Sequence, residues 1–294
     1  MWLTVGCMKS NIRTQILAAF ILAAPVLCWS ADTAQGALGK AEAAFAAAQS
    51  THEGVVQLAD LAARNNPYAA FYLGVAHELG RGVEKSPTLA LEYYRSVADR
   101  VKEAAFNAGR ITYLSGNVAD AVPFFVVAAG GEKADGIDRA MVLLGRIYET
   151  GADIGARNYV AAARWYEAAA RRKDPLAVAK IGEFLLRGLG RAVNTRDARI
   201  YLERAADMWN PDAQFLLGEM FAQGLGMQVN RTEAAKWFLV ASSASKDYQK
   251  RGRAYLAGLT SLESGSAQRM AELWESAHSK PAPIDYLALI ERIR

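Results

Sequence analysis

The stretch that decides the fold is residues 69–98, AAFYLGVAHELGRGVEKSPTLALEYYRSVA. Small and apolar residues recur every three or four positions on both sides of a glycine-rich turn, Gly80–Gly82, so the stretch predicts two helices joined by that turn. Gly74 lies in the first predicted helix, and Ala90 is followed three places on by Tyr93 in the second. The same features return along the chain at a nearly constant interval, which predicts a repeat array.

Two columns of residues mark the repeat. The first is a glycine after an apolar or small residue in the first helix, and its copies lie 35, 36, 37 and 36 residues apart. The second is an aromatic residue three places after an alanine in the second helix. The glycines are Gly74, Gly109, Gly145, Gly182 and Gly218, and the aromatic residues are Tyr93, Phe124, Trp165, Tyr201, Trp237 and Trp274.

Helix starts are predicted by an independent signal. An Asn, Asp or Ser before a helical run supplies an acceptor for the first free backbone amides, and proline is accommodated at the first helical position. These signals open first helices at Asn66, Asp174 and Asn210, and second helices at Ser86, Asn158, Asn194 and Asn230. Glu233, three residues after Asn230, predicts a reciprocal capping box.

The predicted fold is all-α, an α-solenoid of about seven antiparallel helix pairs that form a right-handed superhelix over residues 32–280. In each pair the glycine lets two helix backbones approach closely, and the aromatic residue fills the wedge between that pair and its neighbour. One pair alone cannot bury its apolar face, so the stack itself is the core. A helix over residues 34–50 is expected to complete the first pair, and residues 281–294 are expected to form a capping helix.

This pattern, A-x₃-LG-x₅-G-x-G-V followed by Ala, paired aromatic residues and Ala-Ala, resembles the Sel1-like repeat family, relatives of tetratricopeptide repeats. The resemblance covers about residues 50–278, and residues 69–98 are its best copy. The copy at 103–129 departs from the pattern: its turn is shorter, and Pro123 falls within the second helix. We expect Pro123 to bend or delay that helix unless the helix starts there.

Residues 1–31 predict a secretory signal peptide, with an uncleaved N-terminal anchor as the alternative. Two basic residues precede an apolar run at 16–27 that is shorter than the roughly 20 residues a membrane-spanning helix needs. The initiator is Met1 or Met8. Both cysteines lie in this leader, so the mature chain is expected to have neither disulfides nor thiolate ligands. The mature chain is also expected to have no membrane span and to be periplasmic or secreted.

Charge favours no nucleic-acid partner, since 34 basic and 30 acidic residues give a formal net charge of only +4. One stretch, residues 157–204, is more basic than the rest. It is interpreted either as a solvated surface, with basic residues at helix C-termini, or as a patch for an acidic protein or an anionic polysaccharide. Its candidate contacts are Arg171, Arg172, Lys173, Arg187, Arg191, Arg196 and Arg199.

No catalytic, cofactor-binding or metal-binding residues are predicted. The three histidines, His52, His77 and His278, are far apart in sequence and belong to different repeats. The Gly-x-Gly turns lack the third glycine and the preceding strand of a dinucleotide site, and no Gly-x-Ser-x-Gly motif is present.

The resemblance implies a non-enzymatic adaptor or scaffold of the bacterial envelope that binds a protein partner. Exported Sel1-like proteins are linked with polysaccharide export, cell-wall assembly and regulation of membrane sensors. The alternative is a cell-wall-directed or β-lactam hydrolase of the Sel1-like class, but the resembling hydrolases are rich in cysteine and the predicted mature chain has none. A structural spacer without a preferred ligand is a third reading.

Overall fold

The structure is a computed structural model that describes residues 31–48, 52–131, 136–151 and 154–281. These residues contain fourteen α-helices and no strand, which confirms the predicted all-α class. The helices are α2 (Ala31–Ala48), α3 (His52–Ala63), α4 (Pro67–Leu79), α5 (Pro87–Val97), α6 (Lys102–Leu114), α7 (Val118–Ala128), α8 (Asp138–Thr150), α9 (Tyr159–Arg171), α10 (Pro175–Arg187), α11 (Thr195–Asp207), α12 (Pro211–Gln223), α13 (Arg231–Ser242), α14 (Lys246–Leu256) and α15 (Ser261–Ala277).

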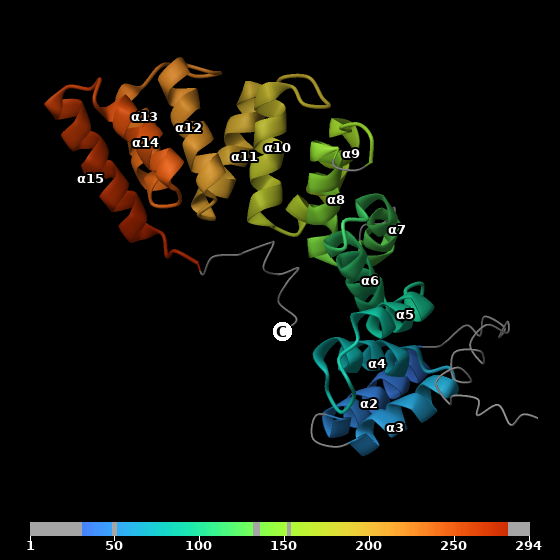
Figure 1. Cartoon of the computed structure of the whole chain (residues 1–294). Helices are drawn as coiled ribbons and strands as arrows, with labels where there is room; N and C mark the ends of the chain where they lie inside the picture. The colour runs from blue at the N-terminus through green and yellow to red at the C-terminus, as the bar shows by residue number, and fades with distance from the viewer. Residues whose placement is uncertain (1–30, 49–51, 132–135, 152–153, 282–294) are drawn as a thin grey trace, which may run out of the picture. The chain divides into compact units, whose positions relative to one another are not determined.

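The helices follow the predicted order of seven pairs, from α2 and α3 to α14 and α15 (Figure 1). In the regular pairs the first helix packs along the second, as α8 does on α9, α10 on α11 and α12 on α13. The second helices α9, α11 and α13 also pack on the next first helices, α10, α12 and α14. The last pair differs, because α15 packs against α13 rather than against α14.

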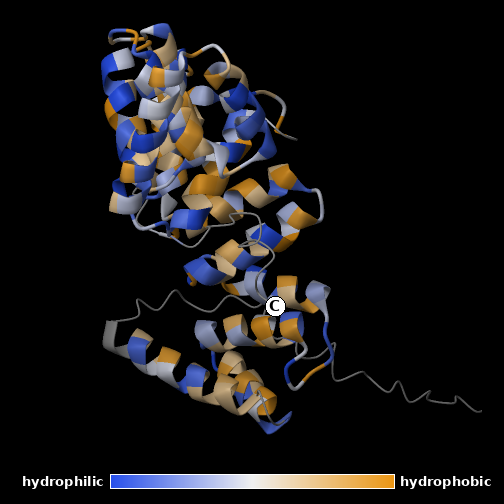
Figure 2. Cartoon of the chain, turned by 90° about the vertical axis from the view of Figure 1, so that its left-hand side faces the viewer, coloured by the Kyte–Doolittle hydropathy of each residue, from blue (hydrophilic) through white to orange (hydrophobic). Residues whose placement is uncertain are grey.

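The chain divides into two compact units, with the boundary after Ile111, inside α6. Within the described residues, unit 1 contains α2 to α5 and most of α6. Unit 2 begins at Thr112 and contains α7 to α15. In both units hydrophobic and hydrophilic residues alternate along the helices, as expected for amphipathic elements that bury one side (Figure 2).

The predicted helix starts are confirmed. Asn210, for example, has an extended backbone, its side chain accepts a hydrogen bond from the Ala213 amide at 3.0 Å, and Pro211 occupies the first helical position. The capping box predicted at Asn230 is only half formed. Asn230 accepts from the Glu233 amide, but the Glu233 carboxylate pairs with Lys236 at 2.9 Å instead of reaching back.

Four of the repeat glycines, Gly74, Gly145, Gly182 and Gly218, are points where a first helix meets its second helix. A Cβ added to Gly145 would lie 2.5 Å from Cε1 of Tyr166, and one added to Gly74 would lie 2.6 Å from Cε1 of Tyr94. Only glycine therefore permits this approach. Leu202 fills the same place against Gly182, and Phe238 against Gly218.

The aromatic column needs a correction. The residue in contact with the glycine is the one after the predicted marker: Tyr93 and Trp165 are half-buried, whereas Tyr94 and Tyr166 are fully buried. Successive residues on a helix point about 100° apart, so only the second residue faces the partner helix. Trp237 is buried as well and contacts Trp274 of α15 (ring centroids 5.5 Å apart). The other markers, Phe124, Tyr201 and Trp274, are half-buried, and Gly109 is buried.

The copy at 103–129 contains a continuous second helix. α7 starts at Val118 and runs through Pro123 to Ala128, so the proline neither starts nor delays it. The missing amide of Pro123 removes one hydrogen bond to the preceding turn. Asn117, the residue before α7, makes no side-chain cap.

The predicted leader and capping helix fall outside the described residues, apart from Ala31 and Pro281. The helix expected over 34–50 is observed as α2. Among the described helices, none has the length and apolar character that crossing a bilayer requires.

Candidate functional site

The residues of the predicted basic patch are distributed over α9, α10, α11 and the loops between these helices. Arg171, Arg172 and Lys173 lie at the end of α9, before α10, whereas Arg187 is the last residue of α10 and Arg191 follows in the next loop. A 13-residue helix is about 20 Å long. The two groups therefore lie at opposite ends of α10, and their role as contacts for an acidic partner stays a prediction.

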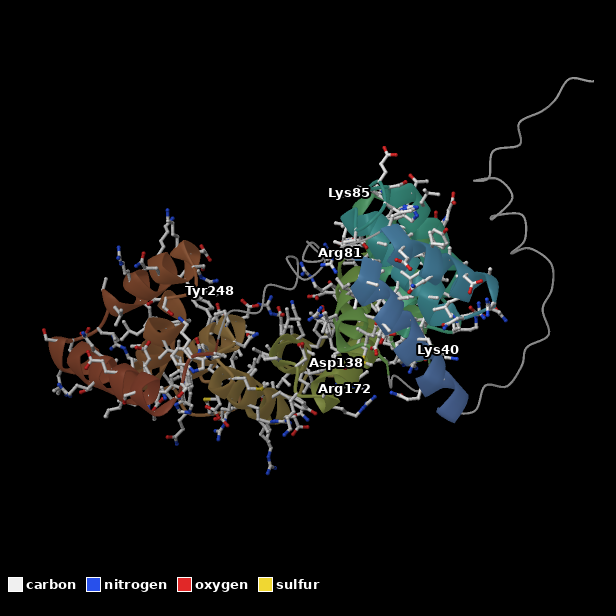
Figure 3. The ribbon with its side chains drawn as sticks, turned by 90° about the horizontal axis from the view of Figure 1, so that it is seen from below. Lys40, Arg81, Lys85, Asp138, Arg172 and Tyr248 are labelled. Carbon is white, nitrogen blue, oxygen red and sulfur yellow. The ribbon has the colours of Figure 1, made fainter. Side chains whose placement is uncertain are left out.

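Ion pairs also neutralise much of this charge. Arg172 bridges to Asp138 at the start of α8, and both residues are labelled in Figure 3. The exposed side chains of Arg171, Lys173 and Arg196 form no ion pair within the described residues. The four pairs are Arg172–Asp138 (2.9 Å), Arg187–Glu183 (3.3 Å), Arg191–Glu167 (2.6 Å) and Arg199–Glu203 (3.0 Å).

The histidines lie in separate packing environments. His52 Nδ1 is 3.1 Å from the Gly82 carbonyl oxygen, and His77 stacks on Tyr93. His278 stacks on Trp274 with ring centroids 4.3 Å apart. The described residues hold no group of three His, Cys, Asp or Glu side chains that could bind a metal ion.

A half-buried polar cluster joins three helices of unit 2. The Tyr166 hydroxyl of α9 donates to Glu149 Oε2 of α8 at 2.6 Å, and Lys180 Nζ of α10 donates to Glu149 Oε1 at 2.8 Å. Lys180 also binds Glu183 at 3.0 Å. The lysine and the two glutamates expose only 18–23% of their side chains. One carboxylate thus connects a helix pair to the next pair.

Burial and neighbouring charges shift the pKa values of Tyr166 and Lys180 in this cluster. Burial raises the pKa of the Tyr166 hydroxyl, and the negative charge of Glu149 raises it further. Burial alone would lower the pKa of Lys180, but the hydrogen bond to Glu149 and the charge of Glu183 outweigh it, so the pKa is raised. Lys180 therefore stays protonated and holds both carboxylates.

Unit 1 repeats the same arrangement. The Tyr94 hydroxyl of α5 donates to Glu78 Oε2 of α4 at 2.8 Å, and Arg110 of α6 donates to the other Glu78 oxygen. The sequence carries the signal for both clusters, because Glu78 and Glu149 each lie four residues after the repeat glycine. The columns of small and aromatic residues alone do not reveal this glutamate position.

A related cluster links α12 to α14. The Tyr248 hydroxyl donates to Asp212, and the Tyr248 ring stacks on Phe215 with centroids 4.6 Å apart. Arg251 binds Glu219 at 2.6 Å and lies over the Phe215 ring at 4.1 Å. Burial, the hydrogen bond and the negative charge of Asp212 raise the pKa of Tyr248.

Seven of these side chains in unit 2 are here named the A-helix row, because every member lies on the first helix of a pair. The charge of Glu183 on α10 also raises the pKa of Tyr248 on α14 (labelled in Figure 3), with α12 between them in sequence. Hydrogen bonds link neighbouring first helices of the row, α8 to α10 and α12 to α14. Its members are Glu149, Lys180, Glu183, Asp212, Glu219, Tyr248 and Arg251.

Three tryptophans form a second cluster at the C-terminal end of unit 2. Trp274 of α15 contacts Trp209, which follows α11, at 4.9 Å, and Trp237 of α13 at 5.5 Å. Lys280 lies over the Trp209 ring, and His278 Nε2 is 3.6 Å from Asp207. The tryptophan rings pack against one another at tilted and edge-to-face angles, so we interpret the cluster as the attachment of α15.

Comparison with known proteins places these features in a family. Four segments match the family model described as Sel1 repeat: residues 67–100, 138–174, 175–208 and 211–246. No curated protein matches the sequence.

Two solved structures share the fold. One is a protective antigen of uropathogenic Escherichia coli strains with an SLR fold (TM-score 0.63, 24% identity), which matches 89% of this chain, while the chain spans 56% of that structure's length. The other is a Sel1 repeat protein from Oxalobacter formigenes (TM-score 0.62, 25% identity, covering 80% of this chain and 98% of that one). With its four matched repeats and these structural neighbours, the chain is a Sel1-repeat protein.

Proposed function

We propose that this chain is a non-enzymatic adaptor of the bacterial envelope that is exported by its N-terminal leader and binds a protein partner on the A-helix row. Sel1-repeat proteins are generally protein-interaction scaffolds, and the fold is typically non-catalytic. Export rests on the charged start and the short apolar run of residues 1–31.

The observation that carries the proposal is the fixed geometry of the A-helix row. Lys180 is held between two carboxylates, and Arg251 is held between Glu219 and the Phe215 ring. A partner that meets side chains already held in place loses less conformational entropy on binding. The row also presents both charge signs and an aromatic ring, which suits a protein surface of mixed chemistry.

A charge swap tests this docking surface. Exchanging Glu219→Arg together with Arg251→Glu keeps an ion pair between α12 and α14 but reverses the charge at both positions. Binding to the partner captured by crosslinking in intact cells is expected to fall at least tenfold in titration calorimetry, with unchanged circular dichroism. The matched control exchanges the exposed pair Arg199 and Glu203 on α11, which lies outside the row.

Two results would contradict the proposal. One is equal loss of affinity in the row swap and the control swap, which would mean that the row is not the docking surface. The other is hydrolysis of β-lactams or cell-wall fragments by the purified chain, which would favour the hydrolase reading instead.

A further inference from the structure

The loops between first and second helices close onto the preceding second helix at three places. Gly82 meets His52 at the start of α3. A Cβ on Gly190 would lie 2.6 Å from the carbonyl carbon of Tyr159 at the start of α9, and one on Gly226 would collide with Thr195 at the start of α11. In these loops the second glycine of the Gly-x-Gly turn seals the space between loop and helix.

In the loop between α8 and α9, the described residues 154–158 leave a space next to α7, the preceding second helix. Gly155 of this loop has a positive φ of 96°, yet among the described residues no atom lies within 4 Å of the place where a Cβ would stand. A recess of about 430 Å³ remains between this loop and α7, the preceding second helix. Its walls include Ala119 and Val122 of α7 and Ile154 and Ala156 of the loop.

The α7 side of the recess is apolar because this copy of the repeat departs from the others. α7 has the sequence VADAVPFFVVA, in which Asp120 is the single charged residue. Pro123 is exposed, and Val127 is 41% exposed. Apolar surface of this kind gains free energy when a partner side chain covers it.

One charged group lines the recess. Arg157 is exposed and donates a hydrogen bond to the Tyr159 hydroxyl at 3.3 Å. A guanidinium has five N–H donors, and this bond uses one of them. Arg157 can therefore bind a carboxylate that approaches from solvent, in the bidentate geometry that arginine favours.

We propose that this recess is an anchor site for a peptide segment of a partner protein, in which a large aliphatic side chain enters the recess and a neighbouring Asp or Glu pairs with Arg157. The volume lies in the range of small-ligand sites, and the lining combines the apolar side chains with the polar Tyr148 and Asn158 and one cation, Arg157. The recess is separate from the A-helix row and goes beyond the docking proposed there.

Methyl-detected NMR titration of the full chain tests the site with three capped tripeptides: Asp-Leu-Asp, Lys-Leu-Lys and Asp-Ala-Asp. Asp-Leu-Asp is expected to give saturable shifts at the methyl groups of Ile154 and Val122. Lys-Leu-Lys is expected to bind at least fivefold more weakly, since it meets Arg157 with like charge, and Asp-Ala-Asp is expected to give no saturable shift.

Two variants locate the binding. Ala156→Trp fills the recess and is expected to abolish the saturable shifts, whereas Ala192→Trp, at the equivalent exposed position of the sealed α10–α11 loop, is expected to leave them intact. Arg157→Glu is expected to weaken Asp-Leu-Asp about fivefold. Arg196→Glu is its control, because it changes the net charge equally on another helix.

Equal affinity for Asp-Leu-Asp and Lys-Leu-Lys would overturn the role of Arg157, and unchanged binding by Ala156→Trp would overturn the site itself. The swap of Glu219 and Arg251 is expected to leave tripeptide binding intact. Failure of the A-helix row and failure of the recess are therefore separate results.

Discussion

At the scale of single residues, the repeat depends on close contact between a glycine and the ring or branched side chain opposite it. Gly145 and Tyr166 show this most clearly, since the ring occupies the space that a Cβ would need. The glycine column could be predicted from the sequence because its spacing is regular. The contact residue could not be assigned, because two adjacent aromatic positions such as Tyr93 and Tyr94 look alike until the rotation of the helix is known.

Substituting Gly145→Ala is expected to destabilise the protein by about 1–2 kcal/mol. The added methyl group forces Tyr166 or α8 to move, and this overpacking outweighs the higher helix propensity of alanine. The free energy of unfolding in urea, followed by circular dichroism, measures the change. Gly36→Ala in α2 is the control, because nothing lies within 4 Å of its Cβ position, and it is expected to stabilise slightly. Equal effects of the two substitutions would contradict the contact.

Tyr166→Phe is expected to lower the free energy of unfolding by about 1–2 kcal/mol at neutral pH, since the substitution removes the hydrogen bond to Glu149. Leu202 occupies the same place in the next pair, so an apolar group is compatible with the fold.

The loss should depend on pH in the alkaline range. Because the pKa of Tyr166 is raised above its ordinary value of 10.0, the stability that this hydroxyl contributes is complete below that pH and is lost as the pH rises above it. The difference in the free energy of unfolding between wild type and Tyr166→Phe is therefore expected to narrow by up to ~1.4 kcal/mol per pH unit above pH 10. A gap that stays constant to pH 11.5 in urea titrations would show that the hydroxyl is not buried against Glu149.

At the scale of elements, helix starts were the most predictable feature, because caps such as Asn210-Pro211 act locally. Two elements departed from expectation for reasons that local sequence does not contain. α7 continues through Pro123, and α15 packs on α13 instead of α14. Both outcomes depend on which neighbouring surface is available for packing.

The attachment of α15 by the tryptophan cluster gives an element-scale prediction. Trp274→Ala is expected to lower the free energy of unfolding by about 2–3 kcal/mol. This is less than for the same substitution at a fully buried tryptophan, because Trp274 is half-buried. Hydrogen exchange is expected to show loss of protection in α15, while α8 to α11 keep theirs, since terminal elements of a repeat array open independently.

Leu273→Ala is the control for this substitution, because Leu273 is on the same helix and is 69% exposed. Protection of α15 that survives Trp274→Ala would refute the attachment. Loss of protection throughout unit 2 would refute the independence of α15.

At the scale of the whole molecule, the sequence predicted the repeat family but not how its charged residues are arranged in space. Arg172 and Arg187 are close in sequence, yet a complete helix separates them in the structure. The A-helix row has the opposite property, because its partners come from different repeats and meet only in the stack, as Glu149 meets Lys180 and Glu219 meets Arg251. Pairing across repeats depends on the superposition of helices, which composition and local charge do not reveal.

The proposed adaptor function depends on which surface of unit 2 meets the partner in the cell. Site-specific photocrosslinking measures this directly, with p-benzoylphenylalanine in place of Arg146, which lies on α8 next to the A-helix row, or of Ile200, which is 48% exposed on α11. We expect a discrete covalent adduct with one partner protein from position 146 and none from position 200. Adducts of equal yield from both positions, or an adduct from position 200 alone, would contradict it.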